Sequence, residues 1–94
     1  MTRQMRKPRR ILVGLKSLDN AVELTTLACR LSSRGASLVL VHVIELPDNT
    51  ALDAEVPGLE AAAQGILRVG ERVARPSHLK AKTRVLRAHS SSSA

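Results

Sequence analysis

Residues 36–46, ASLVLVHVIEL, constrain the fold more than any other part of the chain. Successive side chains of a strand point to opposite faces of a sheet. Leu38, Leu40 and Ile44 would occupy one face of this strand, and three valines would occupy the other. A strand that is apolar on both faces is typical of the interior of a parallel sheet with a layer on each side. We therefore predict that residues 36–46 form the central strand of a parallel sheet.

The flanking segments alternate between strand and helix patterns. Residues 11–15, ILVGL, are a short apolar run, and residues 79–88, LKAKTRVLRA, are a partly alternating run with four cations. Charged strands belong at sheet edges, where Lys and Arg discourage pairing with other chains. Apolar residues at helical spacing lie on either side of the central strand. The predicted order is strand, helix, strand, helix, strand, which implies parallel strands joined by right-handed crossovers.

The first helix is predicted to begin near Asn20 and to end before Gly35. Asn20 followed three residues later by Glu23 matches a capping box, and a glycine suits the left-handed residue that follows many helices. Positions i, i+3, i+4 and i+7 form one side of a helix. The buried stripe is therefore predicted to contain Leu24, Leu27, Ala28 and Leu31.

The second helix is predicted to run from Pro57 to the residue before Pro76, after an acidic loop over residues 45–55. Gly65 and Gly70 lie inside this helix, where each costs about 1 kcal/mol relative to alanine. The two glycines therefore predict either a close approach to a neighbouring element or a soft helix. Pro76 ends the helix, because proline lacks the amide that would continue the hydrogen-bond ladder.

The predicted strand order is 3-2-1, with residues 36–46 in the middle. Both crossovers then step in the same direction, and their shared handedness places both helices on one face. The other face has no cover from this chain, although exposing several large aliphatic side chains forfeits roughly 1.5–3 kcal/mol each. The predicted fold is α/β, a three-stranded parallel sheet with two helices on one face, equivalent to half of a flavodoxin-like or Rossmann-like doubly wound domain. A second copy of the chain or a partner protein is expected to cover the bare face.

Composition narrows the functions open to the chain. A net charge of +7 would attract phosphates, although a solvated tail and a solvated helix face would give the same charge. The chain has no Phe, Tyr or Trp on which unpaired bases could stack, so nucleic acid is disfavoured as a partner. The single cysteine, Cys29, excludes an internal disulfide, and no apolar run reaches the roughly 18 residues of a membrane span. We therefore predict a cytoplasmic protein without a transmembrane segment.

The turn after the first strand carries Lys16 and Ser17. Ligands of parallel sheets bind beyond the carboxyl ends of the strands, and free amides at a helix N-terminus favour anions. Lys16 and Ser17 could therefore contact a phosphate; alternatively, Lys16 is simply solvated and Ser17 caps the helix or forms the turn. The turn is not a P-loop, because the two glycines of that motif would fall on Arg10 and Leu15.

No catalytic or metal-binding constellation is recognisable in the sequence. His42 lies on the central strand and is expected to be a structural histidine, and His78 and His89 have no Cys, His or carboxylate at a ligand spacing. Nothing pairs Ser17 or Cys29 with a histidine as nucleophile and base. We therefore predict that the protein is not an enzyme.

Several segments resemble the first half of the universal stress protein family. The strand RRILVGL, the helix AVELTTLACRLSSRGASL and the strand ending LVLVHVIE carry the resemblance, and LKAKTRVLRA occupies the place of the family's third strand. The resemblance covers about residues 9–89. We accordingly expect a basic flexible arm over residues 1–9, a truncated domain of this kind over residues 10–89 and a disordered Ser-rich tail over residues 90–94.

The resemblance implies a flavodoxin-like fold with strand order 3-2-1-4-5, often dimeric, and ATP binding in one branch of the family. In ATP-binding members an acidic residue ends the first strand, and a small residue comes before it in the family's pattern. The acidic position is Lys16 in this chain, and the small residue is Gly14. Adenine meets the backbone of the residue after the histidine of the second strand, here Val43. The family's phosphate loop, G-x2-G-x9-G-[ST], is absent, because the chain ends where the fourth strand would begin. The nucleotide-binding residues that the resemblance implies are Gly14, Lys16, Ser17 and Val43.

We therefore expect a universal stress-like module that acts in stress response or regulation. Its binding of ATP or AMP is expected to be weak or absent, because the phosphate loop is missing, and no cofactor is assigned. The alternative is a non-enzymatic module, such as a detached regulatory domain of a transporter, that docks a protein or an anionic partner through its bare sheet face.

Overall fold

The computed structural model describes residues 9–33 and 35–89. These residues form strands and helices in the predicted alternating order. The predicted arm, except for Arg9, and the predicted tail over residues 90–94 lie outside the described residues. The elements are β1 (Arg10–Gly14), α1 (Leu18–Leu31), β2 (Ser37–Leu46), α2 (Pro57–Ala74), the short 3-10 helix η1 (Arg75–Ser77) and β3 (Lys80–His89).

The strands form one parallel sheet in the order β1-β2-β3. This is the predicted order 3-2-1 counted from the other edge, and it confirms β2 as the central strand. β1 has five residues and pairs with β2 only as far as Gly14, which lies opposite Val41. β3 follows β2 along its whole length, from Lys80 opposite Ser37 to His89 opposite Leu46.

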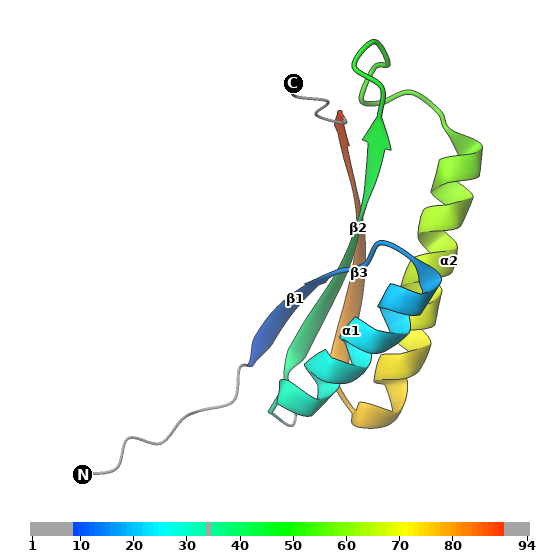
Figure 1. The fold of residues 1–94 in the computed structure, drawn as a ribbon. Helices are drawn as coiled ribbons and strands as arrows, with labels where there is room; N and C mark the ends of the chain where they lie inside the picture. Colours follow the sequence, from blue (N-terminus) through cyan, green and yellow to red (C-terminus); the bar gives the residue numbers. More distant parts are fainter. Residues whose placement is uncertain (1–8, 34, 90–94) are drawn as a thin grey trace.

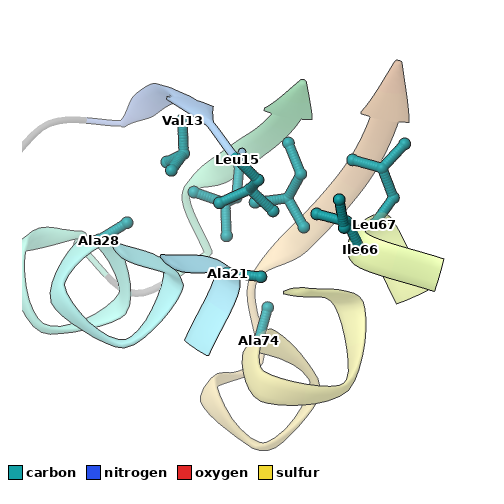
Figure 2. Close-up of a cluster of buried hydrophobic side chains, with 9 residues drawn as sticks. Val13, Leu15, Ala21, Ala28, Ile66, Leu67 and Ala74 are labelled. Carbon is teal, nitrogen blue, oxygen red and sulfur yellow. The ribbon is translucent and has the colours of Figure 1, made fainter. Parts of the chain in front are cut away.

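Both helices cover the same face of the sheet, as predicted (Figure 1). Leu38 and Leu40 of β2 point to that face, and both are fully buried. They belong to one apolar cluster with side chains from β1, α1 and α2, which converge between the sheet and the helices in Figure 2. The buried members of this cluster are Val13, Leu15, Ala21, Ala28, Leu38, Leu40, Ile66, Leu67 and Ala74.

The opposite face of the sheet, called the open face below, is not covered by either helix (Figure 1). By strand alternation it carries Leu12 of β1, the odd-numbered residues of β2 and the even-numbered residues of β3. Leu12 is 72% exposed, Leu86 is 50% exposed and Val43 is 42% exposed. Within the described residues, the chain therefore covers only one side of its central strand. Neither helix in residues 9–33 and 35–89 is both long enough and apolar enough to cross a membrane.

The first helix begins earlier than predicted. Ser17 is its N-cap, and the Ser17 hydroxyl oxygen accepts a hydrogen bond of 3.1 Å from the Asn20 amide. The Asn20 side chain accepts in turn from the Lys16 amide at 2.9 Å. The prediction of Asn20 as the cap is therefore wrong. A serine three residues upstream accepts from a free amide of the first turn instead, and Asn20 supports the cap from inside the helix.

The end of α1 and its buried side also differ from the prediction. The helix ends at Leu31, and the Ser32 hydroxyl donates to the Ala28 carbonyl at 2.6 Å. Gly35 is therefore not the helix cap; its φ of 79° serves the turn that leads into β2. Leu27 and Leu31, predicted to be buried, are 51% and 54% exposed. Ala28 is buried as predicted and Leu24 is partly buried against the core, and the other buried residues of the helix are the small Ala21 and Thr25.

The small side chains of α1 allow it to approach α2 closely at Gly70. A Cβ atom at Gly70 would lie 2.8 Å from Leu40 Cδ1, 2.9 Å from Leu15 Cδ1 and 3.3 Å from Thr25 Oγ1. Of the two alternatives predicted for the glycines, close approach is therefore correct at Gly70. A Cβ atom at Gly65 would have nothing within 4 Å. Because Leu27 lies about 200° around the helix from Thr25, it faces away from α2.

Replacing Gly70 by alanine is expected to lower the free energy of unfolding by about 1–3 kcal/mol, because overpacking outweighs the gain in helix propensity. The matched change Gly65→Ala is expected to raise it by about 0.5–1 kcal/mol, because the added methyl group meets no neighbour. Urea unfolding followed by far-UV circular dichroism measures both, since the chain has no aromatic side chain for fluorescence. A gain of stability in Gly70→Ala would contradict the packing described here.

Candidate functional site

A pocket of about 630 Å³ lies at the carboxyl ends of β1 and β2. Residues 14–16 form one wall, residues 41–45 of β2 form the floor, and Leu59 and Ala62 of α2 form the other wall. Its volume lies within the range of small-molecule sites, roughly 300–1,000 Å³. Its position is also the one at which open parallel sheets bind ligands, because the loops that follow the strands leave a crevice there.

The pocket exists because β1 stops before β2 does. The last hydrogen bond between them runs from the Leu15 amide to the Val41 carbonyl, at 2.7 Å. The next acceptor along β1 is the Leu15 carbonyl, and the Nδ1 atom of His42 lies 2.7 Å from it. Nδ1 must donate in this bond, which leaves Nε2 as an acceptor in the neutral ring. His42 has the structural hydrogen bond expected from the sequence, and it also lines the pocket.

The end of β1 leaves main-chain groups of β2 without a strand partner. In a parallel sheet, alternate residues of a strand direct their amide and carbonyl to the same neighbour. The Ser37 amide donates to Arg9 and the Val41 carbonyl accepts from Leu15, so the odd-numbered residues of β2 face β1. Val43 is the next odd-numbered residue and lies beyond the paired part of β1. Its amide and carbonyl are therefore directed to the edge where the pocket lies.

Three of the four residues predicted as a nucleotide site line this pocket. These are Gly14, Lys16 and Val43. Ser17 does not line it; its hydroxyl group caps α1, which was one of the two alternatives predicted for it. The cap also occupies the amides of Lys16 and Asn20, two groups that a bound phosphate would need. The ammonium group of Lys16 is left as the cation of this turn.

The apolar walls of the pocket were not predicted. Leu59 and Ala62 belong to the first two turns of α2, and the crossover brings them over the ends of β1 and β2. No local pattern distinguishes these residues from the others of the helix, so the sequence gives no signal for them. Lys16 and Glu45 bring opposite charges to an otherwise largely apolar lining. In the described residues, no three His, Cys, Asp or Glu side chains form a group that could hold a metal ion.

Arg87 of β3 anchors the acidic loop and the start of α2. Its guanidinium group donates to the carbonyls of Leu52 and Ala54 and to Glu60 Oε1, the last at 3.1 Å. Glu60 Oε2 accepts from the Val56 amide at 3.1 Å and so supports the first turn of α2, whose N-cap side chain makes no hydrogen bond. This network positions the helical turns that supply the far wall of the pocket.

Replacing Arg87 by alanine is expected to lower the free energy of unfolding by about 1–2 kcal/mol, because three carbonyl or carboxylate acceptors lose a charged donor. Arg87→Lys is expected to recover only part of this loss, since an ammonium group lacks the planar fork. Hydrogen exchange should speed up at residues 50–60 in both variants. Arg84→Ala, on the open face of the same strand, is the control and is expected to stay within about 0.5 kcal/mol of the unchanged protein. Equal effects at the two positions would contradict the anchoring role.

No protein-family model, curated protein or solved structure matches this chain. The resemblance to universal stress proteins therefore stays a prediction.

Proposed function

We propose that the protein is a non-enzymatic regulatory module that binds an adenine nucleotide, AMP or ATP, weakly in the pocket between β1, β2 and α2. The observation that carries this proposal is the free main-chain edge at Val43 beside the cation of Lys16. An adenine ring offers an amino donor next to a ring-nitrogen acceptor. The adjacent carbonyl and amide of Val43 provide the complementary pair.

The other walls of the pocket suit the rest of such a ligand. Ile44, Leu59 and Ala62 provide apolar surface for a flat ring. Lys16 stands at the end of β1, where a phosphate would leave the ring, and it supplies a single exposed charge. The amides of the α1 cap are already hydrogen-bonded, and no glycine-rich loop is present in the sequence. Phosphate groups therefore add little to the binding free energy, and we expect weak affinity for AMP and ATP.

The cellular role rests on the resemblance. Universal stress-like modules act in stress response and regulation, and we propose the same for this chain, in the cytoplasm. The lone Cys29 supports a reducing compartment, because secreted domains of this size are commonly held by disulfide pairs.

Isothermal titration with AMP and ATP is expected to give dissociation constants in the high micromolar to millimolar range. Lys16→Gln should weaken ATP binding about two- to fivefold, the size of one exposed ion pair, and leave adenosine binding unchanged. Lys80→Gln removes a lysine that does not line the pocket and is expected to leave the affinity for ATP unchanged. The proposal fails if no heat is released at millimolar nucleotide, or if Lys80→Gln weakens ATP as much as Lys16→Gln does.

A second candidate function is docking through the open face. It is favoured by Leu12, Val43 and Leu86, which lie on that face and are between 42% and 72% exposed. Side chains of this size are normally buried, and monomeric proteins rarely expose them in contiguous groups. The module would then act by binding a partner, with or without a nucleotide in its pocket.

A further inference from the structure

The open face carries a row of aliphatic side chains that spans all three strands. Val39, Val41 and Val43 follow one another along β2, with Leu12 of β1 opposite Val39 and Leu86 of β3 opposite Val43. Val41 is only 8% exposed, whereas Leu12 is 72% and Leu86 is 50% exposed. Exposure along the row is therefore lowest at Val41 and highest at the two outer leucines.

A second row, of cations, runs along the aliphatic row on its β3 side. Lys80, Lys82 and Arg84 alternate along β3, and all are exposed. Lys82 lies opposite Val39, and Arg84 lies opposite Val41. Two residues of a strand rise about 6.6 Å, so these charges repeat at nearly the spacing of one turn of an α-helix, about 5.4 Å.

Among residues 9–33 and 35–89, none of the cations on the open face forms an ion pair. Arg10 of β1 adds a fourth positive charge, and Glu45 is the single carboxylate that the described strands direct to this face. Glu45 lies opposite Ala88, four residues along β3 from Arg84. The ion pair found in the described residues, Arg87 with Glu60, belongs to the other face. The cation row therefore remains available to an acidic partner.

The charge of the open face decides between the occupants that could cover it. A second copy of the chain would bring the same excess of cations against the first. The chain's own residues 1–9 are also basic, with Arg3, Arg6 and Lys7. A flat lipid surface would meet the exposed Leu12 and Leu86 but hardly Val41, whereas side chains of a helix differ in reach and can contact all three.

We propose that the open face binds an amphipathic α-helix of another protein, with an apolar stripe on Val39, Val41 and Leu86 and a row of Asp or Glu beside it on Lys80, Lys82 and Arg84. This inference rests on the second proposed function, docking through the open face. The face extends over the nine residues from Lys80 to Ala88, roughly 26 Å. A helix of about 18 residues has that length.

A designed peptide of about 18 residues tests the proposal, with Leu at i, i+4, i+7 and i+11, Glu along one flank and one Trp. The Trp fluorescence reports binding without interference, because the protein has no aromatic residue. The Glu peptide is expected to bind with a Kd below about 100 µM, and a copy with Gln in place of Glu at least tenfold more weakly. Raising the salt from 50 to 200 mM should weaken only the Glu peptide.

Two charge-reversal variants locate the site. K82E/R84E changes the cation row and is expected to weaken the Glu peptide at least tenfold. R68E/R72E lies on the exposed side of α2 and changes the net charge by the same amount as K82E/R84E. It is expected to leave the Kd of the Glu peptide within about twofold of the unchanged protein. Leu12→Ser should weaken both peptides, since it removes the most exposed aliphatic side chain of the row.

The possible failures separate the partner's chemistry from docking itself. Equal binding of the Gln and Glu peptides would contradict an acidic partner but would still support docking through the open face. Binding of neither peptide, together with a monomer in sedimentation, would overturn both. A dimer dissociated by Leu12→Ser would make a second copy the occupant, and binding to phosphatidylserine vesicles without peptide binding would make a membrane the occupant. Either result overturns the acidic helix.

Discussion

The contact of Gly70 with Leu15 and Leu40 is the interaction on which the arrangement of the molecule depends. It joins the end of β1, the middle of β2 and the second helix at one point, with Thr25 of α1 beside them. Because no side chain separates α2 from the sheet there, the helix lies close to β2. Interiors of proteins are packed without gaps, so this approach decides where every other residue of α2 can lie.

The candidate pocket follows from that approach and from the unequal lengths of the strands. Close packing at Gly70 brings the start of α2, with Leu59 and Ala62, over the ends of β1 and β2. β1 has five residues and β2 has ten, so β2 continues beyond its partner and leaves Val43 at a free edge. Arg87 then holds the loop and the first turn of α2 in place from the third strand. Residues far apart in the chain thus build one small site.

The same one-sided packing produces the open face. Two helices suffice for one side of a three-stranded sheet, and the other side keeps the aliphatic residues of its central strand. The cations of β3 lie along that side, where they keep the sheet edge soluble and also give the surface a definite charge. Val41, Val43 and Glu45 line the pocket and also belong to the open face, so the two sites share part of β2. β2 is therefore the element that would connect a bound nucleotide with a docked helix.

Much of the fold can be predicted from the sequence because it depends on local periodicity. Alternating Leu and Val in residues 36–46 marked β2 as a central strand, and the charged alternation of residues 79–88 marked β3 as an edge. The two glycines inside α2 predicted either a close contact or a soft helix, and the close contact is found at Gly70 but not at Gly65. The errors occur where two local solutions compete. Ser17 and Asn20 are both good caps, and Leu27 and Ala21 both fit a helical stripe.

Tertiary packing decided which of these caps and which side of α1 the protein uses. The small side of α1 faces the core because α2 approaches within contact of Thr25, so Leu27 and Leu31 are left exposed. The walls of the pocket and the bonds of Arg87 join residues that are separated by more than twenty positions in the chain. Periodicity tells which face of an element is apolar, because it depends on neighbours three or four positions away. It cannot tell which distant element that face meets, because that depends on distances set only once the chain has packed.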